Sequence, residues 1–450
     1  MFEEVVLVAI SSGARLFRDV FPYVEPPRLP LSAAPRWFEP DRLAVTDTTL
    51  RDGQQGWRPL SVEEGYRIYE ALVELGGDGS IFSAEFFLYT GRDRELVRRV
   101  LEAGYEYPRP IGWVRATLSD LRLVVEAGLE ETTLLTSISD YHIYYKLGLT
   151  REKAIEKYLS VVEEAMKKGI VVRCTLEDAT RASLGDNILP FVEKLIRLSE
   201  RYGVDFRVKL ADTLGLGVPF PEAPPPRGVP ALVEALREAG LRADQIEFHG
   251  HNDMGLVVAN HLAAWIHGAG LSNCTLLGIG ERAGNCPLEV MLLHYAGITG
   301  RRPRLEKLPE VVEMLESMGV RVPEWQPLVG RNAFRTKAGV HIDGLMKNPE
   351  VYLPFDPGIV GRSADIAVTP YGGRAAVLMW LRSRLPPGEA AVLDKNDPRV
   401  EALYRDVVRV FDETGRHTPL SDEEMELLAS RYFPQLAGRA AGLEASGAHA

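Results

Sequence analysis

Between about residue 42 and residue 300, short apolar runs alternate with longer amphipathic stretches, and this alternation limits the possible folds more than any other feature of the chain. It is typical of repeated strand–helix units that build a parallel sheet. Two of the amphipathic stretches, 61–75 and 150–168, begin with residue types that cap helices. We interpret eight apolar runs as strands: 43–46, 80–84, 110–114, 132–136, 170–174, 206–210, 245–248 and 274–277.

Eight such units within roughly 250 residues match the size of a closed (β/α)8 barrel. An open doubly wound sheet needs a glycine-rich turn after its first strand, and the segment after 43–46 lacks one. We therefore predict an α/β protein with a TIM barrel followed by a smaller, mostly helical C-terminal region. The expected divisions are an N-terminal arm (1–40), the barrel (41–300), a linker subdomain (301–385), a helical region (386–436) and a flexible tail (437–450).

Charge and cysteine content exclude several classes of partner. The formal net charge is −11 and no basic block stands out, which argues against nucleic acid. No apolar stretch reaches the roughly 20 residues that span a bilayer, and acids stand where a secretory signal carries positive charge, so we expect no membrane association. The 3 cysteines include no C-x-x-C pair, which indicates neither a disulfide framework nor a structural zinc site and fits the cytoplasm.

Polar residues follow nearly every apolar run, at the carboxyl end where barrel enzymes place their chemistry. One such cluster is compatible with a surface loop. Because so many meet at one rim, we expect them to form an active site. The clusters are 47–55, Glu85, Arg115, 137–142, 177–183, 212–215, 249–253 and 278–285.

His249 and His251 lie two positions apart at the end of the seventh run, so their side chains point the same way. Two imidazoles and one carboxylate form a ligand set that leaves positions open for substrate, and Asp52 is the natural third ligand. Such a set suits Mg²⁺, Mn²⁺ or Zn²⁺. The alternative is a pair of hydrogen-bonded core histidines, but Asn252 and Asp253, which follow, favour metal binding.

Three segments in combination resemble the family of homocitrate, isopropylmalate and citramalate synthases, whose barrel is shared with HMG-CoA lyases and pyruvate carboxyltransferases. The similarity covers residues 45–360, and the stretches 83–89, 112–116 and 136–142 look closest to the Re-citrate synthases of this family. The three segments are DTTLRDGQQ (47–55), HGHND (249–253) and GERAGN (280–285).

The resemblance implies a divalent metal, Mn²⁺ or Mg²⁺ with Zn²⁺ or Co²⁺ as alternatives, held by Asp52, His249 and His251. Asn285 would be a further ligand or a neighbour of the ligands. Arg51 would lie beside the substrate ketone, where a fixed cation stabilises developing negative charge.

The resemblance also assigns substrate contacts. It implies that Arg181, Ser183 and Thr213 grip a carboxylate of the 2-oxo acid and that Glu177 lies near the acetyl group. Apart from the resemblance, we assign four further residues to substrate binding, with Glu85 and His142 expected in the pocket wall near Arg115: Gln55, Glu85, Arg115 and His142.

Segments 330–334 and 338–344 resemble the part of these synthases that reaches into the neighbouring subunit's active site. The resemblance then implies that His341 assists enolisation, that Tyr352 acts beside it, and that the protein is a homodimer. From the residues by themselves, a surface histidine and a packing tyrosine are the simpler interpretation.

The implied activity is a Claisen condensation of acetyl-CoA with a 2-oxo acid, most specifically oxaloacetate, giving citrate and CoA. His341 is the first candidate for the base and Glu177 the second. We nominate Arg115 to pair with the second carboxylate of oxaloacetate, the alternative being an arginine at the barrel rim with an exposed head. Other functions stay open: homocitrate, isopropylmalate or citramalate synthase, an aldol-cleaving lyase, or a non-catalytic metabolite-binding homologue.

Overall fold

The computed structural model describes residues 14–436, which form two compact units. One unit comprises Arg28–Val320, and the described residues outside that range form the other. Residues 1–13 of the expected N-terminal arm and the expected tail 437–450 lie outside the described residues. In the described part of the chain, no helix is both long and apolar enough to cross a membrane.

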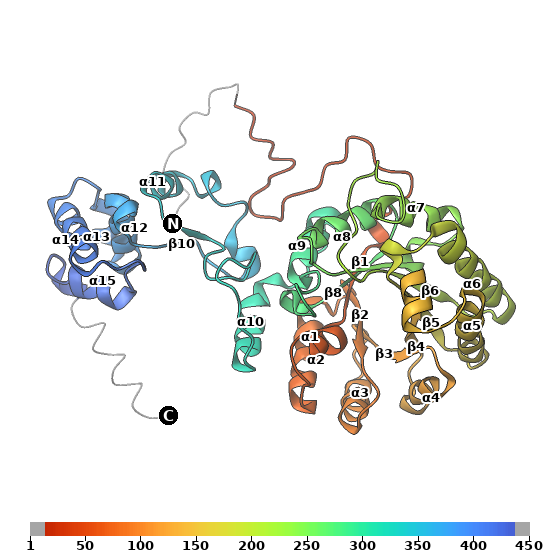
Figure 1. Cartoon of the computed structure of the whole chain (residues 1–450). Coiled ribbons are helices and arrows are strands. Elements are labelled where there is room, and N and C mark those ends of the chain that lie inside the picture. The colour runs from red at the N-terminus through yellow and green to blue at the C-terminus, as the bar shows by residue number, and fades with distance from the viewer. Residues whose placement is uncertain (1–13, 437–450) are drawn as a thin grey trace. The chain divides into compact units, whose positions relative to one another are not determined.

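The first unit contains a closed barrel of eight parallel strands in chain order, with β1 paired to both β2 and β8 (Figure 1). The predicted TIM barrel is confirmed. Seven of the predicted strands overlap the observed ones along most of their length. The strands are β1 (Ala44–Asp47), β2 (Ile81–Phe86), β3 (Arg109–Arg115), β4 (Glu131–Ser137), β5 (Val171–Glu177), β6 (Phe206–Asp212), β7 (Ile246–Gly250) and β8 (Leu271–Cys274).

Helices between the strands cover the outside of the barrel (Figure 1). Ser61 begins α2 by accepting a hydrogen bond from the Glu64 amide, and Thr150 begins α5 in the same way with Lys153, because these hydroxyls satisfy free N–H groups of the first turn. The helices are α1 (Gln54–Gly56), α2 (Val62–Gly76), α3 (Gly91–Ala103), α4 (Leu118–Ala127), α5 (Arg151–Lys167), α6 (Leu189–Tyr202), α7 (Val229–Glu238), α8 (Val257–Ile266) and α9 (Leu288–Thr299).

The prediction of the eighth strand at 274–277 was wrong. The strand ends at Cys274, and the apolar pair Leu276 and Leu277 lies in the loop that follows, with Leu277 in a left-handed conformation (φ 57°). The true strand contains Ser272 and Asn273, whose side chains hydrogen-bond inside the protein. The hydropathy pattern therefore placed the eighth strand too far toward the C-terminus, because this strand contributes polar groups to the interior.

Residues 301–320, expected in the linker subdomain, belong to the barrel unit. The Arg304 amide donates to the carbonyl of Leu75 at 2.9 Å, and Arg58 donates to the carbonyl of Met318 at 2.9 Å. These bonds attach the segment around α10 (Leu308–Ser317) to the α2 side of the barrel.

The second unit is mostly helical, as predicted, and has its own apolar core, which includes Leu381, Leu403 and Met425. Residues 14–27 belong to this unit: Arg18 donates to Glu350 at 2.8 Å, and the Asp356 amide donates to the Tyr23 carbonyl at 2.8 Å. Its elements are β9 (Arg335–Thr336), β10 (Asp365–Ile366), α11 (Gly339–Lys347), α12 (Gly373–Arg384), α13 (Pro387–Val392), α14 (Pro398–Thr414) and α15 (Asp422–Ala429).

Candidate active site

Asp52, His249 and His251 come together at the carboxyl end of the barrel, as the sequence predicted. The Nε2 atoms of the two histidines lie 3.3 Å apart, and the Asp52 Oδ2 atom lies 3.8 Å from Nε2 of His249 and 3.7 Å from Nε2 of His251. Ligand atoms on a divalent cation with bonds of about 2.0–2.2 Å are roughly 3–3.6 Å apart, so a shift of Asp52 by a few tenths of an ångström would let the three side chains share one ion.

The hydrogen bonding of His249 fits a metal ligand. Its Nδ1 lies 2.9 Å from the Asn273 Oδ1, which can only accept, so Nδ1 carries the proton and Nε2 carries the lone pair. The burial of both histidines lowers their pKa values and favours the neutral, metal-binding form. The two Nε2 atoms face each other at 3.3 Å, a separation that either a hydrogen bond between the rings or a shared cation can produce.

Asn285 and Asp52 are joined directly. The Asn285 amide donates to Asp52 Oδ2 at 2.6 Å, and its own Oδ1 is buried without a hydrogen-bond partner, which suits a further metal ligand. Burial opposes ionisation of Asp52, but the charge of Arg51 and the bond from Asn285 favour the anion, and the pKa of Asp52 is lowered. A Cβ on Gly56 would meet the Gly280 carbonyl carbon at 2.0 Å, so glycines allow the first and eighth loops to touch.

Arg51 lies beside Asp52, His249 and His251, and four side chains contact its guanidinium. Its Nη1 donates to Asp52 Oδ1 at 2.7 Å and to Gln55 Oε1 at 3.3 Å, while its guanidinium stacks 4.9 Å from the Trp113 ring centre. Glu85 lies 3.6 Å from Nη2. The Nε of Arg51 is buried and has no partner, which leaves one fixed donor available to a substrate oxygen.

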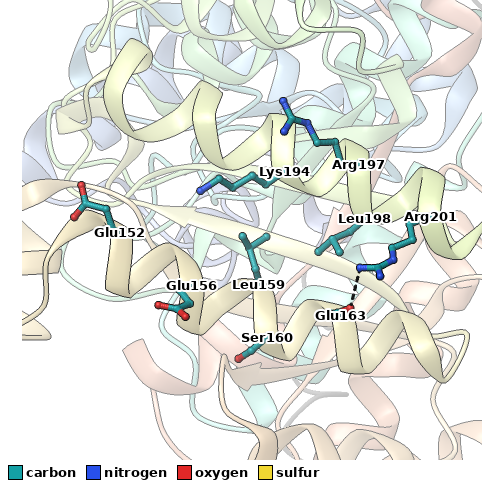
Figure 2. A pocket seen from close by; sticks show the side chains of 9 residues that line it. All are labelled: Glu152, Glu156, Leu159, Ser160, Glu163, Lys194, Arg197, Leu198 and Arg201. Atoms are coloured by element: carbon teal, nitrogen blue, oxygen red, sulfur yellow. Dashed lines mark hydrogen bonds and ion pairs between the residues drawn. The ribbon is translucent and has the colours of Figure 1, made fainter.

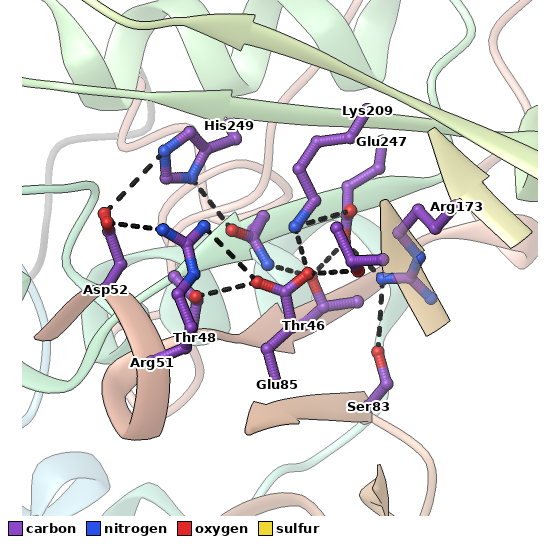
Figure 3. Close-up of polar contacts among 12 residues, drawn as sticks. Thr46, Thr48, Arg51, Asp52, Ser83, Glu85, Arg173, Lys209, Glu247 and His249 are labelled. Carbon is purple, nitrogen blue, oxygen red and sulfur yellow. Dashed lines mark hydrogen bonds and ion pairs between the residues drawn. The ribbon is translucent and has the colours of Figure 1, made fainter. Parts of the chain in front are cut away.

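Beside Arg51, four buried charged side chains form a network in the interior of the barrel (Figure 3). Lys209 bonds Glu85 and lies 3.3 Å from Glu247, and Arg173 donates to Glu247 at 2.7 Å. All four side chains are fully buried, and their two positive and two negative charges balance. Sequence analysis missed this network, although charged residues inside otherwise apolar strands could have indicated it.

Glu85 does not form the pocket wall that we expected. It is 0% exposed, and its carboxylate accepts bonds from Thr48 at 2.8 Å and Thr133 at 2.6 Å in addition to Lys209. Because protein groups surround its carboxylate, Glu85 can affect a substrate only indirectly, by helping to fix the position of Arg51.

Glu177 and His142 form a second cluster at the ends of β4 and β5. The His142 Nδ1 lies 2.9 Å from Glu177, and Lys146 donates to both carboxylate oxygens at 2.8 Å. Burial opposes ionisation of Glu177, yet bonds from His142, Lys146 and Ser137 dominate and lower its pKa to about 2. A carboxylate so strongly stabilised as an anion is a weak base.

Arg181 and Thr213 both bond Asp178 after β5 and β6, and Ser183 lies close to them along the chain. Arg181 donates to Asp178 at 2.9 Å and stacks 4.1 Å from the Tyr141 ring centre, while Thr213 accepts from the Asp178 amide at 2.9 Å. Ser183 caps the next helical turn, where it accepts from the Asp186 amide at 3.2 Å. Arg181 keeps part of its side chain exposed, so it can reach a bound anion.

Arg115 takes the alternative position that the sequence allowed. Its side chain is 63% exposed and forms two bonds with Asp120, at 2.8 Å and 3.0 Å. Arg181 is paired with a carboxylate in the same way, but only 26% of its side chain is exposed, so Arg115 is the better solvated of the two cations.

His341 and Tyr352 lie together in the second unit. His341 is in α11, and Tyr352 follows that helix. Their ring centres are 4.3 Å apart with an interplanar angle of 31°, and both side chains are exposed. The pairing of these two residues agrees with the shared role that the sequence suggested, and that role stays a prediction.

A groove of about 580 Å³ between α5 and α6 is separate from this chemistry (Figure 2). Helix side chains line it, and Arg201 pairs with Glu163 across it at 3.5 Å. No strand end contributes to the groove.

Comparison with known families identifies the barrel. Residues 42–324 match the model described as HMGL-like. The chain belongs to the HMGL-like family. Residues 328–385 of this HMGL-like protein match the model described as homocitrate synthase post-HMGL domain-like, which agrees with the predicted homocitrate and isopropylmalate synthase branch.

Relatives of this HMGL-like protein extend across most of both chains. It is 39% identical to a citrate (Re)-synthase of Clostridium kluyveri over 93% of this chain and 94% of that one. It is 38% identical to a citrate (Re)-synthase of Syntrophus aciditrophicus over 94% of this chain and 68% of that one. A 2-phosphinomethylmalate synthase of Streptomyces hygroscopicus is 39% identical over 88% of this chain and 90% of its own.

Proposed function

We propose that this protein is a metal-dependent acyltransferase that condenses acetyl-CoA with oxaloacetate to give citrate and CoA. The observation that carries the proposal is the position of Arg51 beside three clustered side chains of the kind that bind metals. Arg51 donates to the carboxylate of one of them, Asp52. Similarity to citrate (Re)-synthases along nearly the whole chain supports oxaloacetate as the 2-oxo acid. Mn²⁺ or Mg²⁺ is the proposed cation.

The proposed ligands are Asp52, His249 and His251, with Asn285 able to turn its free oxygen to the ion. A bound divalent cation would supply Lewis-acid polarisation of the ketone. Arg51 stabilises the negative charge that develops on the ketone oxygen, and its pairing with Asp52 keeps it in place before substrate arrives.

Carbon–carbon bond formation requires a base that removes a proton from the acetyl methyl group. We propose His341 for this step, with Tyr352 beside it, because the bonds to Glu177 disfavour that carboxylate as a base. The resulting enolate carbon attacks the ketone carbon, the ketone oxygen takes up a proton, and water cleaves the thioester to release CoA.

The direct test is thiol release from acetyl-CoA by metal-stripped protein resupplied with Mn²⁺. We expect metal-dependent release with oxaloacetate and much less with 2-oxoglutarate, 2-oxoisovalerate or pyruvate. Preference for one of the last three would keep the mechanism and replace the substrate. Absence of release with all four would contradict the enzymatic proposal.

Arg181 is the cation that we propose for a carboxylate of oxaloacetate, in place of Arg115. We expect Arg181→Leu to raise the KM at least about tenfold, the loss of one charged hydrogen bond, and Arg115→Leu to change it less than about threefold. Steady-state kinetics with matched unfolding curves measure both variants. The reverse order would return the role to Arg115 and show that it leaves Asp120 to bind substrate.

We further propose a homodimer in which His341 of one subunit serves the metal site of the other. Mixing His341→Ala with Arg51→Ala protein is then expected to restore activity, up to about one quarter of the wild-type rate if subunits pair at random and each intact site works independently. A mixture that exchanges subunits, shown by a tagged copy, and stays inactive would place His341 outside the partner's site.

A further inference from the structure

A second group of potential metal ligands lies behind the candidate active site. Three side chains, His261, Cys274 and Cys286, bring one ligand atom each to within 4.8 Å of one another, and all three are fully buried. The spacing of the cysteines along the chain gave no sign of this group. α8 supplies the histidine, β8 supplies Cys274, and the loop after β8 supplies Cys286.

Hydrogen bonds prepare His261 to act as a ligand. Its Nδ1 lies 2.7 Å from the Ser272 hydroxyl, and the same hydroxyl lies 3.3 Å from the Cys274 sulfur. If Nδ1–H donates to Ser272, Nε2 holds the lone pair.

The Nε2 of His261 has no hydrogen-bond partner, although the side chain is 0% exposed. A buried polar atom without a partner costs about 1–3 kcal/mol, so this atom needs an explanation. It faces the backbone of β7, where a Cβ on Gly250 would lie 3.5 Å from it, and the neighbouring Phe248 ring offers no acceptor or donor in its place.

We propose that His261, Cys274 and Cys286 supply three ligands to a divalent, thiophilic cation of the Zn²⁺ class at a site distinct from the Asp52 site. Sulfur and imidazole are the donors that Zn²⁺ prefers, and its bonds of about 2.0–2.3 Å need ligand atoms roughly 3.4–3.8 Å apart. The observed limit of 4.8 Å is about 1 Å wider, so ion binding would have to draw the three side chains together. Binding releases two thiol protons, and two thiolates with a divalent ion form a neutral group, which suits a site without solvent.

The site would stabilise the catalytic centre from behind. Cys274 directly follows Asn273, which bonds His249, and Cys286 directly follows Asn285, which bonds Asp52. A cation joining the two cysteines would fix both asparagines through the backbone. This assignment does not depend on the reaction that the barrel catalyses.

Cobalt substitution distinguishes the two sites, because thiolate ligands give Co²⁺ a near-ultraviolet charge-transfer absorption that imidazole and carboxylate ligands do not. The full chain is expressed in minimal medium with Co²⁺ as the added metal, so that the ion is present while the protein folds. We expect two Co²⁺ per wild-type chain with this absorption, and one Co²⁺ with the absorption retained in the His249→Ala/His251→Ala variant.

Cys286→Ser and Cys274→Ala are each expected to lose the absorption, and Cys174→Ser, which changes a buried cysteine outside the group, is expected to keep it. Wild-type protein that binds one Co²⁺ per chain without the absorption would overturn the proposal and leave the three residues as core packing. The wild-type spectrum decides the question even if the cysteine variants do not fold.

Discussion

Replacing Arg51 with lysine is expected to lower kcat about 10²–10³-fold with little change in the affinity for Mn²⁺. Removal of one donor fixed toward a developing oxyanion costs about this much. Lysine keeps the charge but lacks the planar fork with which Arg51 meets Asp52, Gln55 and the Trp113 ring at once. Thiol-release kinetics at saturating oxaloacetate measure kcat, and calorimetric titration measures Mn²⁺ binding.

Gln55→Leu is the matched control, because it removes a neighbour of Arg51 at 3.3 Å and leaves the guanidinium and Asp52 in place. A loss in kcat below about tenfold in this variant would show that the larger loss in Arg51→Lys comes from the missing donor and not from disturbed neighbours. If Arg51→Lys instead weakened Mn²⁺ binding in proportion to kcat, Arg51 would act by positioning Asp52, and its assignment to the ketone oxygen would be wrong.

The barrel was predictable because strand and helix periods are local properties of the sequence. The exception was β8, where Ser272 and Asn273 form the strand and Leu276 and Leu277 form a loop. The chain compensates for these polar strand residues through bonds to α8 and β1, which a local pattern does not contain. Hydrophobic periodicity fails where a strand supplies polar groups to the interior.

The clustering of Asp52, His249 and His251 was predictable for a related reason: these residues come at or after strand ends, and the barrel brings strand ends together. The deeper charges were not, because Lys209 and Glu85 are 124 positions apart and only barrel closure pairs them. The same holds for His261 and Cys286, whose contact depends on α8 packing against the strand and loop of β8.

Exchanging Lys209 for methionine is expected to lower the free energy of unfolding by about 3–5 kcal/mol. The substitution keeps the apolar stem but removes the cation that faces both Glu85 and Glu247. Glu247 then keeps only Arg173, and the nearest cation to Glu85 is Arg51 at 3.6 Å, so the buried network holds an excess of negative charge. Removing one partner of a buried ion pair has a cost of this size. Urea unfolding followed by tryptophan fluorescence measures it, and activity is expected to fall as well, because Glu85 lies 3.6 Å from Arg51.

Lys209→Met combined with Glu85→Gln separates lost charge balance from lost packing. The double variant removes the uncompensated charge of Glu85, so we expect it to recover more than half of the stability lost in Lys209→Met. If the two substitutions acted independently, the double variant would instead lose the sum of the two single losses. Lys194→Met, at the surface groove, is the matched control and is expected to change stability by less than about 0.5 kcal/mol. A cost below about 1 kcal/mol for Lys209→Met would mean that water reaches these carboxylates and that the network does not hold Arg51 in place.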